Sequence, residues 1–140
     1  MAFSSLPHGY ATRFVWTGFM SLRREAKHFI QTAFFEEVFR RRKTDGRWKA
    51  VTAVSCGQQR QGAAAAARLK KEGVDKGIPD VFVAVPAGGY HGLWLTFKSP
   101  GRDCSRPQYE KIALLRSFGY KVEIADDARS AIKITETYLS

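Results

Sequence analysis

The chain has 140 residues and a mass of 15.7 kDa, which suffices for one compact domain and is too short for two ordinary ones. Hydrophobic residues make up 44% and charged residues 26%, so the chain can build a core and does not have the composition of a disordered protein. Lys and Arg number 23 against 13 Asp and Glu, a formal net charge of +10. This balance excludes an acidic protein and favours a polyanionic partner, nucleic acid before an anionic membrane.

The first half of the chain is expected to hold an irregular arm, a long helix, a strand and a short helix. Residues 1–20 mix aromatic residues with glycine and proline, which favours an irregular N-terminal arm. Residues 21–43 contain neither glycine nor proline and place apolar side chains at helical spacing, which predicts a helix. After a turn at 44–46, the alternation of residues 48–54 is typical of a strand. The alanine-rich segment 63–71 predicts a short helix.

The second half is expected to hold a hairpin, two helices and a last strand. The apolar run 81–85 and the segment 93–97 flank a glycine-rich turn and are expected to pair. A helix is predicted over 105–118, followed by a strand over 120–125 and an amphipathic helix over 128–139. This order of elements predicts an α/β fold in which helices cover a mixed β-sheet.

The excess positive charge lies in the first half of the chain. Residues 1–71 contain 14 basic and 4 acidic side chains, whereas residues 72–140 contain 9 of each. We therefore expect the first half to contact a polyanion. The alternative is that a basic surface only keeps the protein soluble.

Several classes of site and of protein are excluded by what the sequence lacks. Cys56 and Cys104 have no cysteine nearby, and there are only three histidines, so a structural zinc site with four ligands is not expected. Reduced thiols and a cytoplasmic location are the default. The chain has no run of about 18 apolar residues and no secretory signal pattern, so we expect no membrane span.

Two charged residues flank the predicted hairpin. Asp80 directly precedes its first strand, and Lys98 directly follows its second strand. Because the two strands pair, a carboxylate and an ammonium come together at one rim of the sheet. Metal-dependent phosphodiester cleavage uses such a rim, since carboxylates hold Mg²⁺ and a lysine orients the attacking water. The alternative for Asp80 is an ordinary turn residue.

An ordered set of motifs runs through the second half of the chain. It consists of Gly73-Val-Asp-Lys-Gly-Ile-Pro-Asp80, Gly88-Gly-Tyr-His-Gly-Leu93, Lys98, Ser105-Arg-Pro-Gln108 and Phe118-Gly-Tyr-Lys-Val122. With these motifs the chain resembles the VRR-NUC family of the PD-(D/E)xK nuclease superfamily, over about residues 26–139. The resemblance implies a mixed β-sheet flanked by helices with an αβββαβ core, in one domain over residues 1–140. It also implies Mg²⁺- or Mn²⁺-dependent cleavage of DNA junctions, flaps or nicked duplexes and, as in small members, a homodimer.

The resemblance assigns roles to individual residues. Asp80 matches the metal-binding Asp, and Lys98 matches the motif lysine. Gln108 matches the Gln of the following helix, and Gln31 matches the Gln of the first helix. The backbone carbonyl of Phe97 is the second metal ligand that the resemblance implies.

Two positions depart from the family pattern. The superfamily carries Glu or Asp two residues before the motif lysine, where this chain has Thr96. The family tends to carry Glu four residues before the first-helix Gln, where this chain has Lys27. The charge of the ligand set thus falls from about −2 to about −1, whereas Mg²⁺ usually takes one or two carboxylates. Two cations at ~4 Å repel by about 4 kcal/mol at an effective dielectric of 20, so a Lys27 ammonium in the site opposes the metal.

Basic side chains are the candidates for phosphate contacts. Lys27 and Lys98 can bind a phosphate in place of a metal. The candidate nucleic-acid-binding residues are Lys27, Gln31, Arg40, Arg41, Arg42, Lys43 and Arg60. The run 40–43 has a second interpretation, because basic residues at a helix C-terminus complement the helix dipole. Arg60 has the alternative of a solvated loop.

The sequence therefore predicts a VRR-NUC-like protein that binds branched or duplex DNA and has an impaired or inactive nuclease site, with no cofactor. Such a protein suits a phage or prophage inhibitor of DNA processing or host defence. The first alternative is an active Mg²⁺- or Mn²⁺-dependent structure-specific endonuclease whose second carboxylate comes from Glu25, Glu36 or Glu37. The second alternative is a protein-binding adaptor that competes with DNA on a nucleoprotein complex.

Overall fold

The computed structural model describes the backbone of residues 11–54 and 62–140 and the side chains of residues 26–54 and 62–140. Arg60, Cys56 and residues 1–10 of the predicted arm lie outside the described residues. The elements are α1 (Ala11–Arg41), the 3₁₀ helix η1 (Gly46–Ala50), β1 (Val51–Ala53), α2 (Ala63–Lys71), β2 (Val81–Val83), β3 (Leu93–Phe97), α3 (Arg106–Ser117), β4 (Lys121–Ala125) and α4 (Ala128–Leu139).

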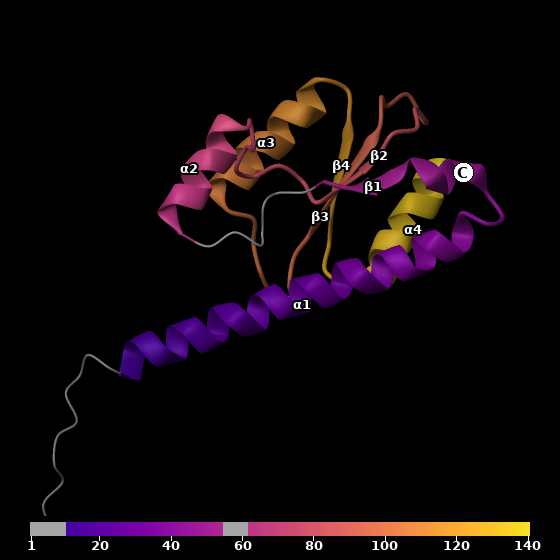
Figure 1. The fold of residues 1–140 in the computed structure, drawn as a ribbon. Helices are drawn as coiled ribbons and strands as arrows, with labels where there is room; N and C mark the ends of the chain where they lie inside the picture. The colour runs from indigo at the N-terminus through magenta and orange to yellow at the C-terminus, as the bar shows by residue number, and fades with distance from the viewer. Residues whose placement is uncertain (1–10, 55–61) are drawn as a thin grey trace, which may run out of the picture.

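The described strands form one mixed sheet in the order β1-β2-β3-β4. The pairs β1–β2 and β2–β3 are antiparallel, whereas β3 and β4 are parallel. A parallel pair needs a crossover connection, and α3 provides it. Figure 1 shows α1 and α4 on one side of the sheet and α2 and α3 on the other. The predicted α/β fold with a mixed sheet between helices is therefore confirmed.

The first helix begins earlier than predicted. Residues 11–20 were expected to be irregular, but α1 begins at Ala11 and continues to Arg41. A glycine inside a helix costs only about 1 kcal/mol relative to alanine, so Gly18 does not end it. Proline is the residue that stops a helix, and none lies between Pro7 and Pro79.

The predicted strand over 48–54 is also wrong in its first part. Residues 46–50 form η1, and only residues 51–53 pair with β2. The Asp45 carboxylate accepts a hydrogen bond from the Arg47 N–H at 2.9 Å, and this cap favours the tight turn over extended chain. Trp48 is buried within this turn and belongs to the main hydrophobic core.

The remaining elements lie within one or two residues of their predicted positions. Ser105 is the N-cap of helix α3, and Gln108 at position N3 completes a capping box with it. Gly119, at φ 86°, follows α3 as the left-handed residue that ends it. The strand β2 spans 81–83 and is therefore two residues shorter than expected.

The side chains of β3 divide between two layers because they alternate across the sheet. Leu93, Leu95 and Phe97 are fully buried on the side of α1 and α4, in a core shared with Phe34 and Val38 of α1. The intervening residues face the side of α2 and α3, where a smaller core joins Trp94 to residues of α3 and β4. Thr96 and Lys98 share this second face by the same alternation, and this places the candidate site.

Phe34 is the contact that holds α1 against the sheet. It is fully buried and meets the ring of Phe97 edge to face, with ring centroids 5.5 Å apart. We expect Phe34→Ala to lower the free energy of unfolding by about 3–5 kcal/mol, since a large buried ring leaves a cavity. Urea denaturation followed by tryptophan fluorescence measures this change. The matched control is Phe29→Ala on the same helix, because Phe29 is 69% exposed and its loss leaves stability nearly unchanged.

Candidate functional site

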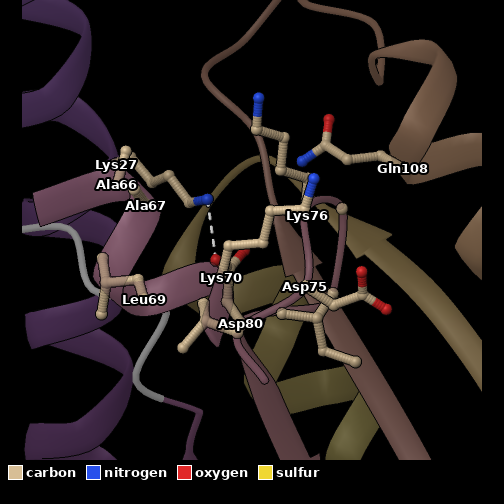
Figure 2. A pocket seen from close by; sticks show the side chains of 12 residues that line it. Lys27, Ala66, Ala67, Leu69, Lys70, Asp75, Lys76, Asp80 and Gln108 are labelled. Atoms are coloured by element: carbon tan, nitrogen blue, oxygen red, sulfur yellow. Dashed lines mark ion pairs between the residues drawn. The ribbon is translucent and has the colours of Figure 1, made fainter. Parts of the chain in front are cut away.

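A cleft of about 680 Å³ opens on the α2 and α3 side of the sheet. Four parts of the chain line it: α1, α2, the loop before β2, and α3 (Figure 2). The lining residues are Lys27, Ala66, Ala67, Leu69, Lys70, Val74, Asp75, Lys76, Gly77, Ile78, Asp80 and Gln108. Three of the residues predicted from the sequence, Lys27, Asp80 and Gln108, therefore lie at one cleft.

Asp80 lies at the floor of the cleft, held by the strands around it. Its backbone N–H donates to the carbonyl of Leu95, and its carbonyl accepts from the N–H of Val54, both at 2.8 Å. The side chain is 5% exposed, and Oδ2 accepts a hydrogen bond from the Phe97 N–H at 2.7 Å. The hairpin therefore fixes the carboxylate at the rim of the sheet, as the sequence predicted.

The second oxygen of Asp80 faces Lys27 of α1. The Lys27 Nζ atom lies 2.7 Å from Asp80 Oδ1, and the lysine side chain is 27% exposed (Figure 2). Burial makes a carboxylate costly unless hydrogen bonds and an opposite charge compensate it, and these two partners supply both. The ammonium thus occupies the side of the carboxylate that opens to the cleft.

Lys98 lies beside this pair and is held by α3. Its Nζ donates to Gln108 Oε1 at 2.5 Å, and its backbone N–H donates to the carbonyl of Ala125 at 2.9 Å. Burial is the main cause that lowers the pKa of Lys98 below its usual range, and the Lys27 ammonium acts in the same direction. The electrostatic interactions of Lys98 with Cys104 and with Asp80 act in the opposite direction.

Gln108 is fixed by the start of α3. Its Oε1 atom accepts from the Ser105 N–H at 2.9 Å and from the Ser105 hydroxyl at 3.2 Å, in addition to Lys98. The capping box that begins the helix therefore also orients the amide at the cleft.

The ligand set does not fit Mg²⁺ or Mn²⁺. Thr96, where the superfamily carries a carboxylate, is 1% exposed and brings only a hydroxyl to this face of the sheet. The Phe97 N–H donates to Asp80 Oδ2, and its carbonyl as a metal ligand stays a prediction. Among the described side chains, no group of three His, Cys, Asp or Glu residues is placed to hold a metal ion. One carboxylate paired with an ammonium is a poor site for a hard divalent cation.

Glu36 and Glu37, the two candidate glutamates whose side chains the structure describes, do not replace the missing ligand. Glu37 forms hydrogen bonds with Arg40 and Arg41, which lower its pKa to about 2. Glu36 lies nine residues after Lys27, so it is about 14 Å further along the helix axis and on the opposite face. The side chain of Glu25 lies outside the described side chains.

The basic run at the end of α1 lies far from the cleft. Arg40 is 13 residues after Lys27 in one helix, a distance of about 20 Å along the axis. Arg41 pairs with Glu37 and with Glu136 of α4, and its guanidinium lies over the Trp48 ring.

The other members of the run divide in the same way between internal contacts and the surface. Arg42 donates to the carbonyls of Trp48 and Val51, at 3.2 and 2.8 Å. Lys43 is exposed beyond the end of the helix. Gln31, a separate predicted residue one turn after Lys27, is half-buried and does not line the cleft. Arg41 and Arg42 therefore tie α1 to α4, η1 and β1.

Two lysines of the cleft were not singled out from the sequence. Lys70 lies in the last turn of α2, and Lys76 lies in the loop before β2. Both belong to segments that the sequence did single out, the alanine-rich helix and the motif that ends at Asp80. Nothing in the linear pattern shows that these segments face each other.

Comparison with known proteins supports the fold. No family model matches the sequence, and no curated protein matches it. Among solved structures, a VRR_NUC domain protein matches with a TM-score of 0.67 and 23% sequence identity, over 81% of this chain and 87% of that chain. The chain has a VRR-NUC-like fold. The resemblance inferred from the motifs is therefore confirmed at the level of the fold. Within the described part of the chain, no helix is long and apolar enough to cross a membrane.

The Lys27–Asp80 pair can be tested by its effect on stability. Lys27→Met leaves a buried carboxylate without its counter-charge, and we expect the free energy of unfolding to fall by about 1–3 kcal/mol at pH 7. In a double-mutant cycle, Asp80→Asn removes the orphan charge, so Lys27→Met then costs much less. Urea denaturation measures all four proteins. Strictly additive losses would show that the two side chains are not coupled.

Proposed function

We propose that this protein binds DNA at the cleft beside Asp80 and that its nuclease site is impaired. The observation that carries the proposal is the Lys27 ammonium on Asp80 Oδ1, at 2.7 Å. A nuclease of this fold is expected to depend on a divalent cation held by carboxylates. Here a fixed monovalent cation from α1 pairs with the carboxylate that the motif provides, and Thr96 replaces the second acid.

The charge of the cleft supports a phosphate ligand. Lys27, Lys70 and Lys76 line it, and its two carboxylates are already paired. Asp80 pairs with Lys27, and Asp75 pairs with Lys111 at 2.5 Å. Lys70 and Lys76 therefore remain as ammonium donors on a concave surface, an arrangement that attracts a polyanionic backbone.

Binding without cleavage gives the protein a blocking role. DNA held in the cleft is shielded from other enzymes, which is the effect expected of an inhibitor of DNA processing or host defence from a phage or prophage. A homodimer and a cytoplasmic location complete this proposal.

The DNA-binding part is tested by the salt dependence of affinity. We expect fluorescence anisotropy with a labelled branched duplex to give an affinity that falls steeply with salt. In Lys70→Gln/Lys76→Gln the slope of log K against log salt becomes smaller by about one per lost phosphate contact. The control is Lys133→Gln, because Lys133 is exposed on α4 across the sheet. An interaction with a purified protein that is insensitive to salt, without DNA binding, favours the adaptor.

The nuclease part is tested by restoring the acidic ligands. Wild-type protein is expected to leave flap, junction and linear DNA intact in Mg²⁺ and in Mn²⁺. The double variant Lys27→Glu/Thr96→Glu is expected to bind Mn²⁺ in a calorimetric titration, because it returns two carboxylates to Asp80. Far-UV circular dichroism checks that it is folded, and Lys27→Glu alone serves where the buried Thr96 position does not accept a charge.

Two results contradict this part of the proposal. Wild-type cleavage that disappears in Asp80→Ala identifies an active nuclease. A folded double variant without metal affinity shows that the site is wrongly assigned.

A further inference from the structure

The cleft has two chemically different walls. One is cationic and consists of Lys27, Lys70 and Lys76. The other is apolar and consists of Ala66, Ala67 and Leu69 of α2 with Val74 and Ile78 of the following loop. Figure 2 shows the aliphatic side chain of Leu69 and the lysine side chains around one space. A phosphate alone uses only the cationic wall, so the apolar wall needs a separate explanation.

The helix α2 has little apolar contact with its own domain. None of its residues is buried, although its sequence is rich in alanine and includes Leu69. A volume of about 680 Å³ lies within the usual range for pockets that hold small molecules, roughly 300–1,000 Å³. A ligand with a flat apolar body next to its anionic group would cover the wall of α2 and reach the lysines at the same time.

Gln108 adds a hydrogen-bond donor with a fixed direction. The Lys98 ammonium can only donate, so the atom that it contacts at 2.5 Å is the amide oxygen. Ser105 donates twice to the same oxygen. The amide nitrogen is therefore left for the cleft, and Figure 2 shows it turned toward the lysine side chains. An amide N–H₂ suits the carbonyl and ring-nitrogen acceptors at the edge of a nucleobase.

We infer that the cleft binds a single unpaired nucleotide. Its phosphate contacts Lys70 and Lys76, its base lies against Ala66, Leu69 and Val74, and Gln108 Nε2 donates to the base. This inference rests on the proposed function, because DNA supplies the nucleotide. It specifies that the DNA bound is one with an unpaired nucleotide. Bases inside a duplex are stacked on their neighbours, so only an unpaired base presents a face to the wall of α2.

The inference predicts that the protein prefers DNA with an unpaired nucleotide, and that this preference is lost when the base is removed. Three labelled ligands are compared by anisotropy at one salt concentration: a blunt duplex, the same duplex with a three-nucleotide overhang, and that overhang with abasic residues. The overhang is expected to bind about tenfold more tightly than the blunt duplex. The abasic overhang keeps every phosphate and is expected to lose most of this gain. Equal affinities for the overhang and the abasic overhang would overturn the inference.

A substitution on α2 tests whether the preference arises in the cleft. Ala67→Trp places an indole in the cleft and is expected to abolish the overhang preference, with the affinity for blunt duplex changed little. The matched control is Ala64→Trp, since Ala64 is an alanine of the same helix that does not line the cleft. Both positions are exposed, so both variants should fold. An overhang preference that survives Ala67→Trp places the base elsewhere and overturns the inference.

Free ligands separate this inference from the proposed function. Calorimetric titration uses a deoxynucleoside 5′-monophosphate and inorganic phosphate. Mononucleotide binding that is tighter than phosphate binding, in a protein with no affinity for any DNA, supports the cleft assignment and refutes DNA binding. DNA binding with no preference for an unpaired base leaves the proposed function intact and refutes the nucleotide site. Phosphate and mononucleotide of equal affinity also refute it, because the apolar wall then contributes nothing.

Discussion

The candidate site depends on how the buried charge of Asp80 is compensated. The carboxylate lies where the hairpin of β2 and β3 meets the end of β1, almost without exposure, and water cannot stabilise it there. It therefore needs an opposite charge, which can be a metal ion or a side chain. In this protein Lys27 provides it from α1, so the same contact neutralises the site and attaches the first helix to the sheet.

A lysine beside Asp80 supports different chemistry from a metal ion at the same place. A divalent ion brings two charges and open coordination positions for a phosphate and a water molecule. An ammonium brings one charge and hydrogen-bond donors, which suffice to bind a phosphate and supply no activated water. Thr96 acts in the same direction, because a hydroxyl does not compensate a divalent cation. In the proposed function, Lys27 and Thr96 together favour binding over cleavage.

The network around Lys98 shows how local structure and the site share residues. Gln108 completes the cap of α3 through Ser105 and holds the lysine through the same oxygen. The start of the helix and the position of the amine are thus one structural feature. This sharing leaves the amide nitrogen as the part of Gln108 that faces the cleft.

The basic side chains that give the net charge of +10 fall into two groups, which composition alone does not distinguish. Arg41 and Arg42 are used inside the molecule, on Glu136, Trp48 and the carbonyl of Val51. Lys70 and Lys76 line a concave surface instead. The arginine run is therefore mainly a helix-end contact, as the dipole interpretation of residues 40–43 allowed.

The sequence by itself determined the order of elements, because hydrophobic periodicity, glycine and proline act locally. The alanine helix, β3, α3 with its Ser105 cap, and α4 follow from such local signals. It also placed Asp80 and Lys98 at one rim, since two strands that flank a glycine-rich turn are expected to pair. Local signals failed where they compete, as at residues 11–20 and at η1, where an Asp45 cap prevails over strand-like alternation.

Only the tertiary structure decided which distant side chains meet. The contact between Lys27 and Asp80 spans more than fifty residues, and whether the lysine points into the site depends on how α1 packs through Phe34 against Phe97. The cleft itself, with an apolar wall from α2 and the following loop and with lysines from three segments, exists only because the loop before β2 folds back beside α3. Such contacts depend on packing between elements, and no pattern within one element encodes them.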